Sequence, residues 1–543
     1  MRLYNQFPRS YQNIEAMTLQ LEEVSKLGFD TVWTNPLYKT GEQYKKNYTK
    51  GELAKNALPT NKKGSLYAMN ASLDMNKSED FLNSDFTDGT EKTHTALLKE
   101  YTARAVELGI TPIFDLVLKH VAIDSKLCEE KPNWFDRHKT TNEFKIRGIS
   151  EDGFATKDYP WDDVASFNYN DPEIRDEIIE QFWKPFIFKQ IAVHGFRGAR
   201  LDAAGMMPKA VYDELNDYIK TTVKRFHNAD AIIFAETFGN LELVTSYIGE
   251  LSDNDVTHVT NSLHWVQTKI GPNISSSSDD YLDVWNKEDG FANKDMGIKQ
   301  QMTHLNRGRG FGDNSRKVIN STQRVGTIGF VSSHDEEPWA LRLQKNIEEN
   351  EWIKDPNEVT KGMREKIAVV AFGSDGGWYI TCGDEYATQK QKNVFDSKKE
   401  EQLLWKYDGA LQYQEEIHSD LTEYIKSVNS ALQSLEKVNK GGLGEWKERI
   451  EIDGKPDLVI FVCHKMNYDG NSYIMVANIN PEKQLELTKD DMKEIASKSK
   501  NPEKTLLAAD NNMIFFADDK LSISSSQKRD HHLDKPKHAV KMR

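Results

Sequence analysis

Four carboxylates in this chain each follow a short apolar run, at Asp115, Asp202, Glu236 and Asp335. The runs are rich in β-branched, aromatic or small residues and are bounded by polar residues or glycine, which predicts buried strands. In a barrel of alternating strands and helices, the carboxyl ends of the strands form the open face where catalytic groups gather. Carboxylates that converge there can divide the roles of acid, base and nucleophile.

Neighbouring residues separate this interpretation from a simpler one. Each acid could be a helix N-cap just past a strand, because aspartate is common at that position. However, Arg200 lies two residues before Asp202, and His334 directly precedes Asp335. A cap needs neither partner, whereas an arginine keeps a nearby carboxylate ionised and a histidine can hydrogen-bond sugar hydroxyls. The residue types therefore favour a catalytic cluster.

The segments FDLVLKH, GARLDAA, FAETF and FVSSHD resemble four signature segments of the α-amylase family, glycoside hydrolase family 13. Further matches, among them LYNQFPRSY, LGFDTVWTNPLY, GSLYAMN and FNYNDPEIRDEI, extend the resemblance from about residue 3 to 480. The resemblance implies that Asp202 is the nucleophile, Glu236 the general acid and base, and Asp335 a third carboxylate that grips the sugar. The residues implied to line the subsite of the reacting glucose are Tyr67, Asp115, His120, Arg200 and His334.

The spacing of the first two carboxylates predicts the stereochemistry. Asp202 and Glu236 are separated by one strand–helix unit, so they should lie on adjacent strand ends. Two carboxyl groups about 5–5.5 Å apart favour double displacement through a covalent glycosyl-enzyme, with net retention. Glu236 would protonate the departing oxygen while Asp202 attacks the anomeric carbon. Water or another sugar could then take the intermediate.

Two departures from the family pattern concern calcium. Lys119 replaces the asparagine of the first signature, and Ser166 replaces an aspartate of a second segment. Both positions supply oxygen ligands to the family's structural calcium, which requires six to eight oxygens. A lysine ammonium could take over the charge of the ion. We therefore expect no calcium at this position, no metal in the site and no cofactor.

A third departure follows the implied nucleophile. Gly205 and Met206 replace the Lys-His pair that is common in α-amylases. This change removes contacts on the leaving-group side, so we expect short oligosaccharides or chain ends to react better than internal bonds of long starch chains.

The order of predicted elements indicates an α/β fold, a (β/α)8 TIM barrel. We expect the barrel over residues 1–120 and 171–438, with a small inserted domain after the third strand at 121–170. That insertion contains many aromatic residues, including Trp134, Phe135, Tyr159 and Trp161, and as a domain it would form one wall of the cleft; the alternative is a solvent-covered loop with no role in binding. After the barrel, short alternating strands predict a C-terminal β-sandwich at 439–520, followed by a flexible tail at 521–543. A further polar insertion at 266–324 would be a loop or lid.

Composition limits the partners. Acidic residues outnumber basic ones 85 to 71, and a net charge of −14 argues against nucleic acid while suiting a neutral carbohydrate. The cysteines Cys128, Cys382 and Cys463 form no metal pattern, which favours reduced thiols. The sequence shows neither a cleavable signal peptide nor a membrane span. We expect a cytoplasmic protein, or one exported without a cleaved signal.

The leading functional prediction is a retaining glycosidase that hydrolyses α-glucosidic bonds. The first alternative is a glycosyl- or maltosyltransferase that uses the same intermediate, because CEEKPNWF and the following helix resemble maltosyltransferases that use maltose 1-phosphate. The second alternative, from a different class, is a barrel without catalytic activity that serves as a carbohydrate-binding or scaffold subunit.

Overall fold

The computed structural model describes the larger part of the chain. The described residues are 1–42, 65–136, 163–204, 207–236, 258–260, 326–334, 338–349, 357–373, 377–390, 392, 394, 404–405, 419–438, 443–452, 455–466, 473–478, 486–487, 490–491, 504–509, 513–518 and 540–541. The predictions for Asp335, Gly205, Met206 and the 266–324 insertion lie outside these residues.

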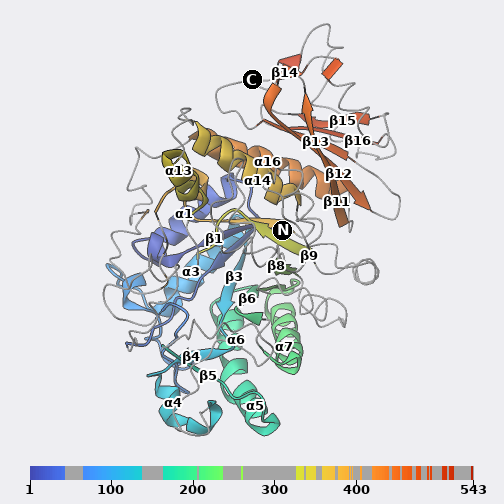
Figure 1. Ribbon diagram of the computed structural model, residues 1–543. Helices are drawn as coiled ribbons and strands as arrows, with labels where there is room; N and C mark the ends of the chain where they lie inside the picture. The colour runs from blue at the N-terminus through green and yellow to red at the C-terminus, as the bar shows by residue number, and fades with distance from the viewer. Residues whose placement is uncertain are drawn as a thin grey trace.

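A closed barrel of parallel strands forms the centre of the molecule (Figure 1). In their order around the barrel, the strands are β1 (Arg2–Gln6), β10 (Gly377–Thr381), β9 (Gly326–Phe330), β8 (His258–Thr260), β7 (Ile232–Ala235), β6 (Gly198–Leu201), β3 (Thr111–Leu116) and β2 (Thr31–Thr34). This arrangement confirms the predicted TIM barrel. The sequence analysis missed β8, whose three residues are too few to form a recognisable apolar run.

Side chains alternate between the inside and the outside of the barrel, as expected for strands. A cluster inside the barrel contains Leu3, Trp33, Ile113, Phe234, Ile328, Phe330 and Tyr379. Their neighbours, such as Tyr4 and Val32, belong to the larger core outside it. Gly198 is required where β6 approaches β7, because a Cβ atom there would lie 2.0 Å from the carbonyl oxygen of Ile232.

Helices surround this barrel. They include α1 (Ile14–Lys26), α3 (His94–Glu107), α5 (Pro172–Ile178), α6 (Lys184–Phe188), α7 (Lys209–His227), α13 (Trp339–Glu349), α14 (Glu358–Gly373) and α16 (Ser419–Val438). Short 3₁₀ turns lie at Pro8–Ser10, Ser84–Phe86 and Asp384–Tyr386, and π-helical segments at Ile179–Trp183 and Lys189–Val193 flank α6. The first helix begins after Asn13, whose side chain accepts a hydrogen bond from the N–H of Ala16.

A short antiparallel pair of strands lies after β3, in the region where the sequence predicts an inserted domain. Strand β4 (His120–Ala122) pairs antiparallel with β5 (Val164–Ser166), and α4 (Lys126–Glu130) with the 3₁₀ turn Pro132–Trp134 follows β4. Trp134 and Phe135 are buried, and Phe135 stacks on Phe167 with ring centroids 4.9 Å apart. These two aromatic residues therefore pack inside the protein. Tyr159 and Trp161 lie outside the described residues, and the limits 121–170 stay a prediction.

An antiparallel sheet forms the C-terminal part, drawn in orange and red in Figure 1. Its strand order is β11 (Leu443–Ile452), β12 (Lys455–Met466), β13 (Tyr473–Asn478), β16 (Met513–Asp518) and β15 (Lys504–Ala509). A smaller pair joins β14 (Glu486–Leu487) to β17 (Val540–Lys541), which lies within the predicted tail. The domain limits and the two-layered sandwich remain predictions.

Two further observations concern the described part of the chain. It contains no helix that is long and apolar enough to cross a membrane. Of the three cysteines, Cys128 and Cys382 are buried and form no disulfide.

Candidate active site

The register of the barrel strands brings the predicted catalytic residues to one level. Asp115 on β3 is paired with Arg200 on β6, and Leu201 on β6 is paired with Ala235 on β7. Asp202 and Glu236 directly follow the second pair, so they leave adjacent strands at the same height. Neighbouring strand ends thus deliver the two carboxylates to the carboxyl face of the barrel, as the sequence predicts.

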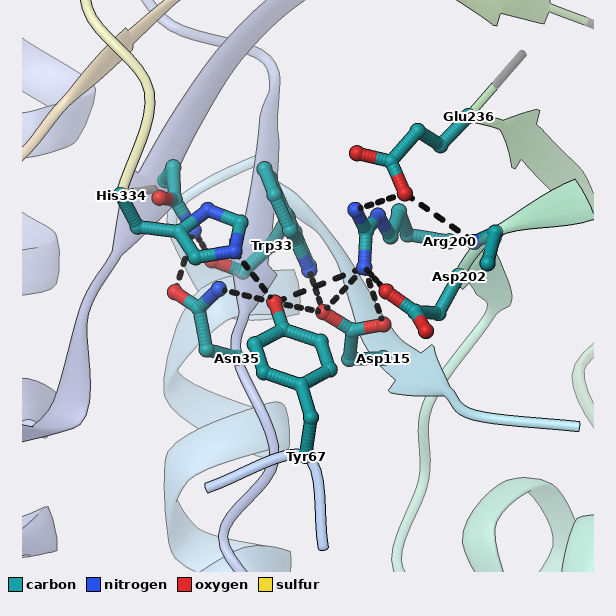
Figure 2. Close-up of polar contacts among 10 residues, drawn as sticks. Trp33, Asn35, Tyr67, Asp115, Arg200, Asp202, Glu236 and His334 are labelled. Atoms are coloured by element: carbon teal, nitrogen blue, oxygen red, sulfur yellow. Dashed lines mark hydrogen bonds and ion pairs between the residues drawn. The ribbon is translucent and has the colours of Figure 1, made fainter. Parts of the chain in front are cut away.

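Arg200 is the centre of this cluster (Figure 2). Its Nη1 donates to Asp202 Oδ1 at 2.6 Å and to Asp115 Oδ1 at 3.0 Å, while its Nη2 lies 2.8 Å from Glu236 Oε2. The guanidinium also lies 5.0 Å from the centre of the Trp33 ring. Arg200 is fully buried, and the carboxylates around it hold its pKa well above the ordinary value although burial acts against the charge. One cation therefore orients three acids.

Asp115 and Asp202 differ in access to solvent. The side chain of Asp115 is 0% exposed, and burial raises its pKa to about 6 against the opposing effects of Arg200 and Tyr67. The side chain of Asp202 is 11% exposed, compared with 5% for Glu236. Asp115 is therefore suited to holding Arg200 and Tyr67 in place, and Asp202 is the carboxylate best placed to meet a substrate.

Tyr67 joins this cluster to the first two strands (Figure 2). Its hydroxyl donates to Asp115 Oδ2 at 2.9 Å and accepts from Asn35 Nδ2 at 2.8 Å. The hydroxyl also lies 2.6 Å from His334 Nε2. This one hydroxyl group therefore contacts Asp115, Asn35 and His334, which lie on three different segments of the chain.

A pair of asparagines sets the direction of these hydrogen bonds. Asn5 Nδ2 donates to the carbonyl of Trp33 at 3.3 Å and to Asn35 Oδ1 at 2.8 Å. Only the NH2 of an amide can donate to a carbonyl, so this contact fixes the orientation of Asn5 and then of Asn35. Asn35 must therefore present its NH2 to Tyr67. Asn5, Trp33 and Asn35 were not predicted as site residues, although LYNQFPRSY contains the first and LGFDTVWTNPLY the other two.

The two predicted histidines occupy different surroundings. His334 follows β9, and its ring stacks between Tyr67 and Phe7, with centroid distances of 5.3 and 6.3 Å. His120 is buried on β4, and burial together with the charge of Lys119 lowers its pKa to about 3. A hydrogen bond to the main chain of Tyr67 places His120 beside the cluster. Asp335, which follows His334, lies outside the described residues.

The residues at the implied calcium position do not fit a calcium ion. Lys119 brings a positive charge close to His120, as the lowered pKa of that histidine indicates. Ser166 is buried in β5, opposite His120. A hard divalent cation requires several oxygen ligands, preferably anionic ones, and a lysine opposes its binding. The described residues contain no group of three or more His, Cys, Asp or Glu side chains that could hold a metal.

Comparison with known proteins supports the fold. No model of a protein family matches the sequence, and no curated protein does. The structure is similar to an α-amylase from Lactobacillus plantarum, with 16% identity over 95% of this chain and 98% of that one and a TM-score of 0.53. The α-amylase of Geobacillus thermoleovorans, complexed with acarbose, matches at 14% identity over 95% and 97% of the two chains, with a TM-score of 0.56.

A relative of a different specificity shares the same fold. The trehalose-6-phosphate hydrolase of Bacillus licheniformis matches at 13% identity over 95% of this chain and 98% of that one, with a TM-score of 0.57. At these identities the similarity shows a common fold, and residues in this chain must carry any argument about activity.

Proposed function

We propose that this protein is a retaining α-glycosidase of the α-amylase type, which hydrolyses α-glucosidic bonds in α-glucans or maltooligosaccharides. One observation carries the proposal, the contact of a single buried arginine with Asp115, Asp202 and Glu236 at the carboxyl ends of neighbouring barrel strands. A structural ion pair needs one acid, whereas glycoside hydrolysis needs two with different roles.

The proposed reaction begins with attack of Asp202 on the anomeric carbon. Arg200 keeps this carboxylate ionised and oriented, and Glu236 gives its proton to the leaving oxygen. The bond from the anomeric carbon to the leaving group breaks as the bond to Asp202 forms. Water then attacks the anomeric carbon, the bond to Asp202 breaks, and the proton that the water loses goes to Glu236, so the product keeps the α configuration.

Tyr67 and His334 would hold the reacting sugar. Their rings are stacked and linked through the tyrosine hydroxyl, so together they form a rigid surface next to Asp115. Asp335 would complete this subsite as a third carboxylate. In this proposal the chain requires no cofactor and no metal in the site, and its partner is a carbohydrate rather than nucleic acid.

The transferase remains an alternative, because a second sugar can replace water in the last step. Its sequence argument rests on CEEKPNWF, in which Cys128 and Trp134 are buried. Since these residues pack inside the protein, they carry little weight for choosing a donor or an acceptor. A scaffold without catalytic activity would have little need of the Arg200 cluster.

Product analysis tests the proposal. Maltooligosaccharides of increasing length are incubated with the protein, with and without added phosphate. Chromatography should show mainly short sugars as products, and NMR of the anomeric proton should show that they keep the α configuration. Predominant chain elongation, or dependence on a sugar 1-phosphate, would favour the transferase. A β product would overturn the mechanism, and no release from any α-glucoside would favour the scaffold.

A further inference from the structure

The two oxygens of the Glu236 carboxyl have different surroundings. Oε2 accepts a hydrogen bond from the main-chain N–H of Ala203 at 3.0 Å and lies 2.8 Å from Arg200 Nη2. In Figure 2 the other oxygen, Oε1, makes no contact with the residues drawn. The N–H that reaches Glu236 belongs to the residue directly after Asp202. The proposed nucleophile and the proposed acid are therefore linked through the main chain.

Ala203 has an uncommon backbone conformation. Its φ is +48°, in the left-handed region, which L-residues other than asparagine and aspartate rarely adopt. Among the described residues other than glycine, only Asn228 and Ala387 share this sign of φ. Such strain persists where surrounding contacts impose it, and it is often found at functional sites. Here the chain turns sharply after β6, and the Ala203 N–H donates to a side-chain carboxylate.

The contacts of Oε2 determine which oxygen of Glu236 can carry the acidic proton. In a carboxylic acid, one oxygen carries the hydrogen and donates, while the other only accepts. An oxygen that already accepts from a guanidinium and an amide has both lone-pair directions occupied. Oε2 is therefore the accepting oxygen, and a proton on Glu236 belongs on Oε1.

We propose that the main-chain N–H of Ala203 is a positioning group for the general acid, fixing Glu236 through Oε2 so that Oε1 delivers the proton. This inference rests on the proposed function. In the first step the Oε1–H bond breaks and its proton goes to the glycosidic oxygen, which leaves Glu236 as a carboxylate. Both donors then bind an anion, and charge-assisted hydrogen bonds are the stronger ones. In the second step, water attacks the anomeric carbon, the bond to Asp202 breaks, and the proton that the water loses goes to Oε1.

The direct test removes only this donor. The Ala203 residue in the full-length chain is replaced by lactic acid, which turns its main-chain N–H into an ester oxygen and keeps the methyl group. Ala387 provides a matched control, because it is a buried alanine with φ +53° whose N–H donates to the carbonyl of Asp384 at 3.1 Å. The same ester at Ala387 removes an equivalent hydrogen bond outside the cluster.

Two substrates separate positioning of the acid from general damage. Hydrolysis of a maltooligosaccharide needs protonation of the leaving group, whereas α-glucosyl fluoride has a leaving group that departs with little help. The Ala203 ester should lower kcat on the maltooligosaccharide by about 10- to 100-fold, the usual value of one hydrogen bond to a charged group, with KM little changed. On the fluoride its kcat/KM, which reports only the first step, should stay close to that of the unmodified enzyme. The Ala387 ester should show no such difference between the substrates.

A thermodynamic cycle tests the contact without relying on turnover. The Ala203 ester should lower the Tm of the unmodified protein more than that of Glu236→Ala, while the Ala387 ester should lower both equally. Equal losses of Tm at Ala203 in the two backgrounds, or equal losses of kcat/KM on the two substrates, would overturn the positioning role and leave the proposed function standing. Coupling in the cycle together with no activity on either substrate would overturn the acid role and the proposed function.

Discussion

Replacement of Asp115 by asparagine should change how the stability of the protein depends on pH. Burial raises the pKa of Asp115 from 3.8 to about 6, although Arg200 and Tyr67 oppose the shift. The folded state therefore holds its proton more tightly than the unfolded state. This contribution to stability is fully present below about pH 4, is lost as the pH rises, and is gone above about pH 6.

The size of the effect follows from the two pKa values. At 1.36 kcal/mol for each pKa unit, a rise from 3.8 to about 6 corresponds to about 3 kcal/mol. Asp115→Asn does not titrate, so the free energy of unfolding of the wild type should fall by about 3 kcal/mol relative to that of the variant as the pH rises from about 3 to 7. Urea denaturation at a series of pH values measures this difference.

A surface variant provides the control for this comparison. Asp230 lies beside Lys224, and its side chain is 99% exposed, so Asp230→Asn should follow the wild type at every pH. If the difference between the wild type and Asp115→Asn stayed constant, burial would not control the protonation of Asp115. If the wild type instead gained stability with rising pH, Arg200 would outweigh burial.

Three further predictions concern the general acid Glu236, the binding of calcium, and the hydrogen bond from Asn35 to Tyr67. Glu236→Gln should keep the fold, judged by circular dichroism, and lose about 10²–10⁴ of turnover on maltooligosaccharides; retention of more than roughly a tenth of the rate would disprove its role. Thermal melts with EDTA and with excess calcium should coincide because Lys119 opposes the ion, and a large decrease in Tm with EDTA would contradict this. Asn35→Ala should lower stability by about 1–3 kcal/mol, since it leaves buried groups without a partner. Asn35→Ala should also lower kcat because it loosens Tyr67, and this loss of kcat should disappear in a Tyr67→Phe background; equal losses in both backgrounds would show that Asn35 does not act through Tyr67.

The sequence predicts the barrel and much of its site because both depend on local patterns. Apolar runs mark the buried strands, and a barrel places the carboxyl end of every strand at one face. Asp202 and Glu236 could therefore be assigned to neighbouring strand ends from the length of one strand–helix unit. The observed register confirms that placement.

Other features depend on contacts between distant segments. Asn5 and Asn35 act on Tyr67 only because the barrel closes β1 against β2, and a polar residue at the end of a strand gives no sign of this by itself. The left-handed conformation of Ala203 also gave no signal, because alanine favours helices and strands over this region. Trp134 and Phe135 belong to the insertion that is expected to form one wall of the cleft, and nothing in the sequence indicates that both side chains are buried.

Identification of the covalent intermediate tests the central claim most directly. A 5-fluoro-α-glucosyl fluoride forms a glycosyl-enzyme that breaks down slowly, and mass spectrometry of the digested protein locates the modified residue. We predict one sugar on Asp202, in the segment GFRGARLDAA, with no labelling of Asp202→Asn. A sugar attached to another residue, or retained hydrolysis of α-glucosides without modification of Asp202, would contradict the proposed mechanism.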